Sequence, residues 1–498
     1  MELHACGRAV RIFIMNFKII LRMLGSLFLI EALLLIPSVG LAIYDGEPLV
    51  LKALVITMLL LVILALLIRI CCKCSERTFY AREGFLLVAM AWIVLSAFGA
   101  LPFYLSGEIP HYVDAFFEIV SGFTTTGSSI LTDVEAMSRP LLYWRSFSHW
   151  LGGMGILVFM LAIVPSARGN GNSFHLLRAE SPGPSIEKLT PKMQHHTSYL
   201  YAIYIFLTLL CLSLLLVGGM PFFDSLCITF GTAGTGGFGI RTDSMASYPV
   251  FCQGVVTVFM ALFGVNFNIY FLLLFRRWKE ALLDEELRVY LGIMLGAIAI
   301  VTLNVSHLFH NLWEAFHHVA FSVSSVMTTT GYATADFDKW PEFSRGILMV
   351  LMLFGASAGS TAGGIKVARL VMMAKSAGRE LQRMLHPRSV MSVRMNNRPV
   401  GEHTLRGISV FLICYLAILV ASFLLISLDG FSLETNLSAV IACLNNIGPG
   451  LGMVGPTGSF AAYSPLSKMV LSADMLLGRL EIFPLVILFN PRSWNRAT

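Results

Sequence analysis

The sequence predicts an all-α polytopic membrane protein with two N-terminal helices followed by four helix–re-entrant loop–helix repeats. Its composition is the first observation: of 498 residues, 56% are hydrophobic and 13% charged, and the mean hydropathy is +0.76. A soluble domain of this length does not have such a balance. The second observation is that long apolar segments alternate with short ones. The third is a polar, glycine-ended turn that recurs four times along the chain.

The first two spanning helices are expected near residues 17–44 and 49–72. Basic residues precede the first apolar segment, and no small-residue cleavage site follows it. This pattern favours a retained helix over a cleaved signal peptide. Residues 1–75 are therefore interpreted as an N-terminal two-helix extension.

Each of the next four units combines a spanning helix, a short apolar segment, a turn and a second spanning helix. The short segments have roughly 10–14 residues, too few to cross a bilayer and suitable for re-entrant helices. The units are predicted at 76–170, 171–278, 279–390 and 391–498. The expected spanning helices are 84–106 and 140–165, 198–217 and 249–275, 288–308 and 344–375, and 404–428 and 463–489. The expected re-entrant helices are 112–123, 222–232, 313–327 and 432–444.

A polar turn follows each re-entrant helix. At membrane depth such a turn is tolerated only where its backbone lines a water-filled path, so four of them predict one pore with four walls. A dehydrated cation in that pore needs oxygen ligands, which backbone carbonyls can supply. Glycine permits the positive φ that turns these carbonyls inward. The re-entrant helices would also direct their negative C-terminal ends at the ion.

The predicted ion-binding segments are the last three residues of each turn. They are Thr125, Thr126 and Gly127; Thr235, Gly236 and Gly237; Thr329, Thr330 and Gly331; and Asn446, Ile447 and Gly448. We expect the ion to contact the carbonyls of Thr125, Thr126, Thr235, Gly236, Thr329, Thr330, Asn446 and Ile447.

The alignment of the second turn is open by one residue, because either Gly236 or Gly237 can be its terminal glycine. Gly237 follows Asp224 by thirteen positions, and Gly127 follows Asp114 by the same offset, which favours Gly237. The fourth turn differs in having Asn446 where the others have threonine.

Charge along the loops predicts the orientation. Basic loops at 69–82, 168–192, 276–288 and 366–406 alternate with acidic ones. The positive-inside rule places the basic loops and both termini in the cytoplasm, and the four turns on the outer side. An acidic rim there would raise the local cation concentration.

A run of small residues near the end of the third unit predicts a broken helix. Its glycines weaken any helix, and we interpret the segment as a loop beneath the turns. Close packing of helices through small residues is the alternative. No Gly-Lys-Ser/Thr follows, which excludes a phosphate-binding P-loop. The residues concerned are Gly355, Gly359, Ser360, Thr361, Gly363, Gly364 and Lys366.

Arg479 is the one Lys or Arg that we expect near the middle of a spanning helix. Because an arginine is expensive there, it is expected to face a pore or a partner. A structural pair with Asp474 or Glu481 is the alternative.

Four strings carry a resemblance to a known family. They are Ser121–Gly127, Thr328–Gly331, Asn445–Gly452 and Gly478–Phe483. Together they resemble the bacterial TrkH/TrkG potassium-uptake subunits of the Trk/Ktr/HKT superfamily, over essentially the whole chain. The resemblance implies a pseudo-fourfold pore whose selectivity filter has one glycine per repeat: Gly127, Gly237, Gly331 and Gly448. Four glycines imply potassium, and the 355–364 loop is implied to be an intramembrane gate opposed by Arg479.

The resemblance also implies location and partners. These are the bacterial inner membrane, a homodimer, and a TrkA-type cytosolic regulatory subunit through which alone a nucleotide would act. No covalently bound cofactor, nucleic acid or enzymatic activity is expected, and anionic lipid would also explain the basic loops. One alternative is a sodium-permeable or H⁺/Na⁺-coupled symporter of the same superfamily. A membrane-embedded enzyme is the other, but the turns carry threonine and glycine in place of an acid, base or nucleophile.

Overall fold

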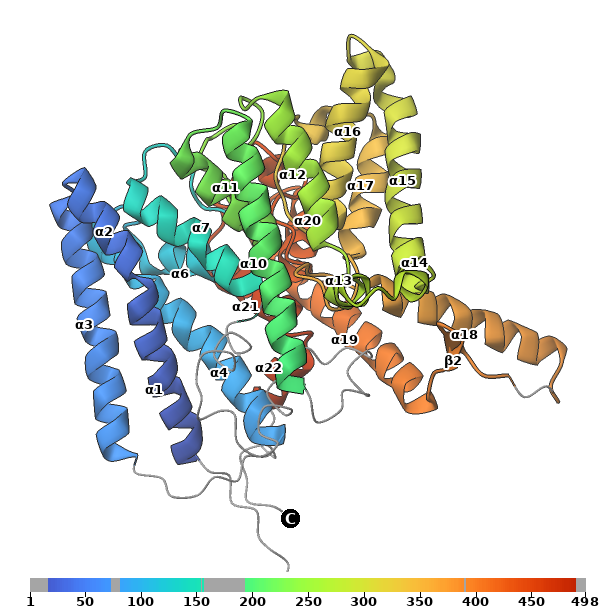
Figure 1. The fold of residues 1–498 in the computed structure, drawn as a ribbon, viewed down its shortest axis with the longest axis horizontal. Helices are drawn as coiled ribbons and strands as arrows, with labels where there is room; N and C mark the ends of the chain where they lie inside the picture. Colours follow the sequence, from blue (N-terminus) through green and yellow to red (C-terminus); the bar gives the residue numbers. More distant parts are fainter. Residues whose placement is uncertain (1–16, 73–80, 154, 156–192, 389–390, 490–498) are drawn as a thin grey trace, which may run out of the picture.

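Helices make up nearly all of the regular structure in this computed structural model (Figure 1). It describes residues 17–72, 81–153, 155, 193–388 and 391–489. Within these ranges the strands are β1 (Arg394–Met395) and β2 (Arg398–Pro399), which pair antiparallel. The predicted all-α class is therefore confirmed. Both termini, the basic loop at 168–192 and the end of the predicted helix 140–165 lie outside the described residues.

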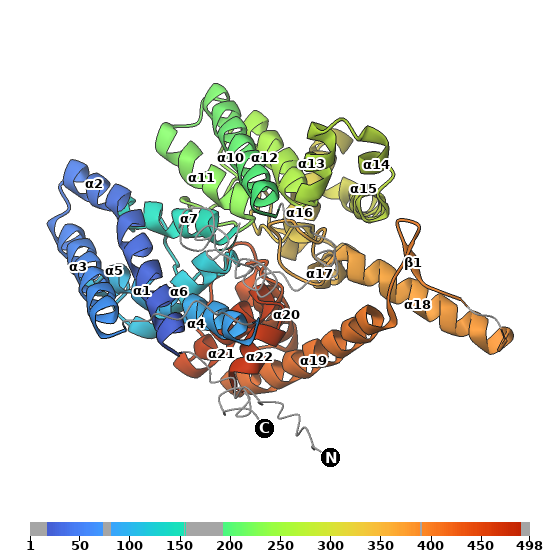
Figure 2. The same ribbon diagram turned by 60° about the horizontal axis from the view of Figure 1, so that its bottom comes forward.

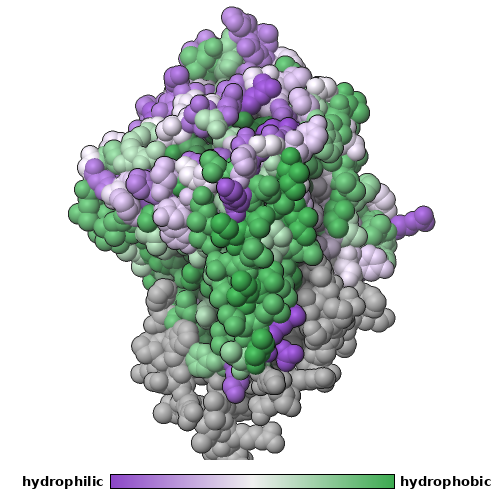
Figure 3. Space-filling model, turned by 90° about the vertical axis from the view of Figure 1, so that its left-hand side faces the viewer, coloured by the Kyte–Doolittle hydropathy of each residue, from purple (hydrophilic) through white to green (hydrophobic). Residues whose placement is uncertain are grey.

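The N-terminal extension lies beside the rest of the bundle (Figure 1). α1 (Phe17–Leu34) and α2 (Ile36–Asp45) form one apolar segment, and α3 (Pro48–Cys71) returns along α1. The outer face of α3 exposes apolar side chains such as Leu59 and Ile63. This side of the molecule presents a broad apolar surface below a polar cap (Figure 3), as expected for contact with lipid acyl chains.

The four repeats follow one another around a common centre, in the colour order cyan, green, yellow and red (Figure 2). Their first helices are α4 (Ala81–Gly99) with α5 (Leu101–Ser106), α10 (Met193–Val217), α15 (Glu285–Val305) with η3 (Ser306–Leu308), and α19 (Glu402–Ile426) with η5 (Ser427–Asp429). Their re-entrant helices are α6 (Tyr112–Phe123), α11 (Phe222–Gly234), α16 (Leu312–Met327) and α20 (Leu433–Leu444). Their second helices begin with α7 (Arg139–Gly153), α12 (Val250–Phe263), α17 (Glu342–Leu353) and α21 (Pro465–Arg479).

The remaining elements are short or lie at one end of the bundle. They are α13 (Phe267–Leu274), α14 (Trp278–Leu282), η4 (Phe337–Lys339), α18 (Val367–Leu385), η6 (Gly452–Val454) and α22 (Phe483–Phe489). Among the described residues, six helices are long and apolar enough to cross a membrane, or seven if a bent pair counts as one. The chain is thus a multi-pass membrane protein.

Two second helices are interrupted where the sequence predicted continuous ones. The predicted helix 249–275 is split into α12 and α13, which meet at 89°. The Gly264 carbonyl accepts a hydrogen bond from the Ser357 amide, and the Asn266 side chain caps the new helix α13. The predicted helix 463–489 is split into α21 and α22. There the Ile482 amide donates back to the Leu477 carbonyl and closes the end of α21.

The predicted helix 344–375 is interrupted between α17 and α18, and α18 runs on to Leu385. α18 projects away from the bundle (Figures 1 and 2). Its middle is fixed by Lys375, whose ammonium donates to Glu285 on α15 and to the Arg394 carbonyl. The segment between α17 and α18 therefore leads into a helix that is anchored to α15.

Candidate ion pathway

All four re-entrant helices end in the same backbone motif. A left-handed residue follows each helix within two positions: Thr125, Thr235, Thr329 and Asn446 have φ between 54° and 57°. The next amide donates back to the helix, from Thr126 to Ser121, Gly236 to Gly231, Thr330 to Ser325, and Ile447 to Ala442, at 2.8–2.9 Å. This is the Schellman arrangement, in which the left-handed residue is usually glycine.

Threonine at three of these left-handed positions is unusual. A β-branched residue with positive φ is a conformational outlier that costs about 1–2 kcal/mol. Strain of this kind persists where the surroundings enforce it, commonly at functional sites. The Thr125 and Thr329 hydroxyls both face groups below the turns: Thr125 Oγ1 accepts from Arg479 Nη1 (3.1 Å), and Thr329 Oγ1 accepts from the Gly363 amide (2.7 Å).

Two residues further on, each turn has a glycine with positive φ. The angles are 84° at Gly127, 75° at Gly237, 87° at Gly331 and 102° at Gly448. The turns therefore align as left-handed residue, intermediate residue, glycine. In this alignment Gly237 corresponds to Gly127, and Gly236 corresponds to Thr126.

The four glycines close the turns into a ring. A Cβ atom on Gly127 would collide with the Gly236 carbonyl, one on Gly237 with the Thr330 carbonyl, and one on Gly331 with the Ile447 carbonyl. A Cβ on Gly448 would lie 2.9 Å from the Thr126 carbonyl oxygen, which returns the sequence of contacts to the first turn. Each glycine thus lies against the carbonyl preceding the glycine of the next turn.

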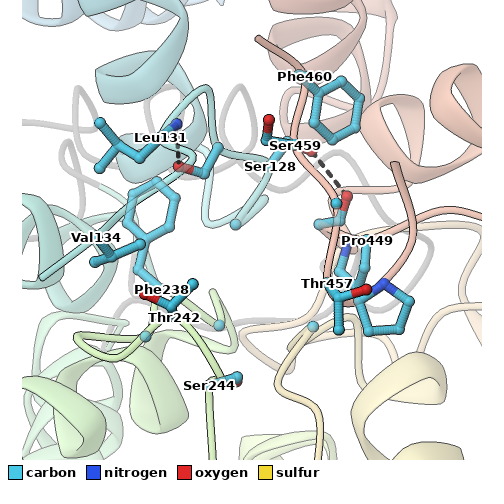
Figure 4. Close-up of a pocket in the computed structure, with 18 of the residues that line it drawn as sticks. Ser128, Leu131, Val134, Phe238, Thr242, Ser244, Pro449, Thr457, Ser459 and Phe460 are labelled. Carbon is cyan, nitrogen blue, oxygen red and sulfur yellow. Dashed lines mark hydrogen bonds between the residues drawn. The ribbon is translucent and has the colours of Figure 1, made fainter. Parts of the chain in front are cut away.

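The ring forms the floor of an open cavity of about 260 Å³. All four glycines line it, and the turns approach it from four sides (Figure 4). Among the residues of its wall that the structure describes, the charged ones are Arg145 and Arg241, with no Asp or Glu. The exposed acidic residues Asp133, Glu135 and Asp243 lie beside lining residues of this cavity but not on its wall, and the acidic rim stays a prediction. Two other acidic residues of these repeats pair with cations, Asp114 with Lys468 (2.6 Å) and Asp224 with Arg241 (3.7 Å).

Gly236 is a glycine because a histidine fills the space of its side chain. A Cβ there would collide with the imidazole ring of His149, although Gly236 itself lacks a positive φ. The His149 ring lies 4.1 Å from the Phe238 ring, and its Nδ1 donates to the Gly122 carbonyl (2.9 Å). Glycine is thus required at positions 236 and 237 for different physical reasons.

Residues 354–366 form a loop directly below the ring. A Cβ on Gly363 would collide with the Asn445 carbonyl at the end of α20, and one on Gly355 with the Gly363 carbonyl. Gly359 and Gly364 have φ angles of 70° and 69°. Small residues are therefore required by the loop's own folding and by its contact with the fourth turn.

The polar residues predicted for this loop mainly fix its shape. The buried Lys366 ammonium donates to the Ala362 and Gly363 carbonyls. Ser360 Oγ donates to the Ser357 carbonyl (2.7 Å), and Thr361 Oγ1 donates to the Phe263 carbonyl (3.3 Å). Lys366 thereby occupies the interior, outside the basic cytoplasmic loop to which its sequence position had assigned it.

Arg479 joins the loop, the ring and the first repeat. Its Nη1 donates to the Thr125 hydroxyl and to the Thr361 carbonyl (2.8 Å), and its Nη2 donates to the Gly152 and Gly153 carbonyls. Arg479 is the last residue of α21, so its predicted position near the middle of a continuous helix is wrong. Of the acidic residues considered as partners, Glu481 accepts from Arg369, and Asp474 accepts from Ser422.

Comparison with known proteins identifies the fold and its family. The TrkH family of cation transport proteins matches residues 50–496. This chain belongs to the TrkH family. The family is one of transport proteins, so the chain is a transporter and not an enzyme, and the predicted family resemblance is confirmed.

The similarity to individual TrkH proteins extends over most of the chain. The Trk system potassium uptake protein TrkH of Salmonella typhimurium is 37% identical over 425 residues, covering 83% of this chain and 86% of that protein. TrkH of Halomonas elongata is 32% identical over 492 residues, 97% of this chain and 100% of that protein. The crystal structure of the potassium transporter TrkH from Vibrio parahaemolyticus matches with a TM-score of 0.85 at 29% identity, covering 97% and 100% of the two chains.

A buried ion pair behind the ring was missed in the sequence of this TrkH-family protein. Arg145 lies within α7, 2% exposed, although the sequence analysis placed every Lys and Arg except Arg479 in loops or near helix ends. Its Nε donates to Glu118 Oε1 (2.6 Å) and its Nη1 to the Gly239 carbonyl (2.8 Å), and its Cζ lies 3.5 Å above the Phe238 ring.

Glu118 completes this brace from the first repeat. Fully buried, it accepts from Ser129 Oγ and from the Ile130 amide, both at 2.9 Å. The pair thus connects the segments that leave the first and second turns. The pair could have been suspected from the sequence, because an arginine lies inside a predicted apolar helix and a glutamate lies on the preceding re-entrant helix.

The paired glycines of the second turn can be separated by mutation. We expect Gly236→Ala to lower the free energy of unfolding by about 1–3 kcal/mol, because the new methyl group overlaps the His149 ring. Adding His149→Ala should recover part of this loss. Gly237→Ala should lose stability that His149→Ala does not restore. Thermal unfolding of the purified proteins in detergent measures the three single and two double variants, and strictly additive effects of Gly236→Ala and His149→Ala would contradict the contact.

The Glu118–Arg145 brace is expected to matter for stability. Arg145→Ala leaves a buried carboxylate without its partner and should cost about 3–5 kcal/mol. Arg277→Ala is the matched control, because the Arg277–Glu280 pair is about half-exposed on both sides and should contribute at most about 1 kcal/mol. Equal shifts in melting temperature for the two variants would argue against the brace.

Proposed function

We propose that this chain takes up potassium across the bacterial inner membrane through the ring of four turns, which acts as the selectivity filter. The observation that carries the proposal is the closed sequence of contacts from glycine to carbonyl among the four turns. The Trk system names of the relatives support potassium as the ion. The filter residues are the twelve predicted from the sequence, with Gly127, Gly237, Gly331 and Gly448 as its glycines.

Carbonyl oxygens gathered around one axis favour a dehydrated cation. The surrounding chemistry supports this, because the re-entrant helices end at the ring and direct their negative dipole ends toward it. Backbone amides behind the ring are bonded to the helices, so the carbonyls remain available for the ion. Neither a covalent step nor a bound cofactor is needed for this function.

The 354–366 loop is the proposed intramembrane gate. It lies against the end of α20, and its Gly363 amide donates to the hydroxyl of Thr329 in the third turn. Arg479 adds a positive charge at the same level and holds the loop through the Thr361 carbonyl. A fixed cation there repels an arriving potassium ion and sets the resting barrier.

The regulatory partner is proposed to be a TrkA-type cytosolic nucleotide-binding subunit, and the membrane subunit is proposed to form a homodimer. α18 supports a cytoplasmic docking site because it projects from the bundle and exposes charged side chains while its base contacts the gate loop's flank. A displacement of α18 would therefore be transmitted directly to the gate loop. Both termini are proposed to lie on this cytoplasmic side.

Growth of a strain that lacks its own potassium uptake tests the proposed function. Expression of this chain should restore growth at low potassium, and co-expression of a cytosolic regulatory subunit should enhance the effect. Uptake of potassium or rubidium tracer into the same cells measures the transport itself. Failure of the inserted protein to restore either growth or uptake would refute the proposal.

Gly127→Ser is the selectivity variant for this assay. The serine Cβ collides with the Gly236 carbonyl, so the substitution displaces a proposed ion ligand. We expect sodium permeation to rise relative to potassium. Gly407→Ser, at an exposed helical position with open space around it, is the control and should keep the wild-type selectivity.

Arg479→Ala should raise the basal flux of the unregulated protein. A barrier lowered by about 1.4 kcal/mol or more corresponds to at least a tenfold increase in rate. Tracer flux into proteoliposomes measures this, and Arg479→Lys separates the two roles of the side chain. If the charge sets the barrier, the basal flux of the lysine variant stays at the wild-type level. If the hydrogen bonds hold the loop in place, the basal flux of the lysine variant rises. Reduced flux in a folded Arg479→Ala protein would count against both roles.

A further inference from the structure

Glu31 is a buried carboxyl in the N-terminal extension, outside the proposed pathway. Its side chain is 3% exposed, and neither carboxyl oxygen has a hydrogen-bond partner in the part of the chain that the structure describes. It faces a small cavity of about 20 Å³ lined by apolar and aromatic side chains of α1, α4, α6 and α7, including Leu95, Phe123 and Trp144. A buried carboxyl without hydrogen-bond partners is energetically costly, which a bound ligand would relieve.

The space around the carboxyl depends on a glycine. A Cβ on Gly99 would lie 3.2 Å from Glu31 Oε1 and 3.0 Å from the Phe123 ring. The Gly99 carbonyl accepts a hydrogen bond from Trp144 Nε1 (3.1 Å). The site lies where α1 and α4 meet the end of the first re-entrant helix.

The residues that line this cavity determine which ligand Glu31 can bind. An ionised carboxylate without donors or a counter-charge is strongly disfavoured in apolar surroundings. A metal cation would need several oxygen ligands, and Glu31 supplies the only carboxyl on the described wall. The volume of about 20 Å³ leaves room for no ligand larger than a water molecule. We propose that Glu31 is a proton-binding site, occupied at neutral pH.

Most charged groups on the surrounding elements have other partners or lie at the surface, and the buried Glu83 of α4 lies outside the cavity wall. Among the described residues, Glu118 pairs with Arg145, Asp114 with Lys468, and Asp45 of α2 with Arg139, while His149 bonds to the Gly122 carbonyl. Lys18 and Arg22 on α1 and Lys52 and Arg69 on α3 are exposed, and Glu83 lies in the first turn of α4. None of these side chains lines the cavity. The proton on Glu31 is therefore not exchanged with an adjacent ionisable group.

Release of the proton would affect the first turn of the ring. Phe123, on the cavity wall, is the last residue of α6 and directly precedes Thr124–Gly127. A carboxylate here would place a negative charge at the already negative end of that helix. This part of the inference rests on the proposed function, whereas proton binding itself does not.

Infrared difference spectroscopy of the reconstituted protein tests proton binding. The wild type at neutral pH should show, in the carbonyl band of protonated carboxylic acids, a component that Glu31→Gln lacks. Glu47→Gln, which removes an exposed carboxyl before α3, should retain this component. Glu31→Asp keeps an acid and should shift the component, which preserves the test if Glu31→Gln fails to fold. Identical spectra for wild type and Glu31→Gln, or for wild type and Glu31→Asp, would overturn the proposal.

Transport measurements test the effect on the pore. Rubidium uptake into proteoliposomes should fall as pH rises in the wild type and stay level in Glu31→Gln. If Glu31→Gln transports with the wild-type pH profile, or if the wild-type profile is flat, the effect on the first turn is refuted while the proposed potassium pathway stands. If neither protein transports, the pathway is refuted, and the infrared result still decides proton binding.

Discussion

The close approach of each ring glycine to the carbonyl of the next turn is the constraint on which the rest of the structure depends. No side chain fits in these four contacts, so the four turns must meet at one level. That level fixes where all four re-entrant helices end, and hence where the second helices must pass them. Carbonyl oxygens that carry the same partial charge repel one another when no cation lies between them. Side chains packed around the outside of the ring must therefore stabilise it.

The supports behind the ring differ from one interface to the next. Between the first and second turns it is the buried Glu118–Arg145 pair. Between the second and third, the Tyr332 hydroxyl lies 3.2 Å from both the Ile228 and Phe238 carbonyls. Between the fourth and first, Ser128 Oγ donates to the Gly448 carbonyl (3.0 Å). The ring is therefore fourfold in its backbone and asymmetric in its supports, which lets the repeats diverge in sequence while preserving one geometry.

The sequence predicted those elements whose boundaries are set by neighbouring residues, and it missed features that depend on contacts between distant residues. The re-entrant helices were predicted within about two residues of their observed ends, because a turn with fixed spacing follows each one. The interruptions after Phe263 and Arg479 were not predicted. Their causes are distant: the Gly264 carbonyl is taken by Ser357, and Arg479 bonds to carbonyls of the first repeat. Arg145 was missed for the same reason, since its pairing with Glu118 appears only when two helices pack.

The unpredicted interruption at 264–266 and the 354–366 loop form one mechanical unit. The Ser357 amide donates to the Gly264 carbonyl, and the Phe267 amide donates to the Gly359 carbonyl, both at 3.1 Å. From the other side, Glu286 Oε1 accepts from the amides of Ala358 (2.6 Å) and Ala368 (3.1 Å), which brackets the loop and the start of α18. Displacing the loop must break these bonds or carry the α12–α13 bend and α18 with it. A force on α18 therefore acts on groups in the second and third repeats together, while Arg479 connects the same loop to the first and fourth.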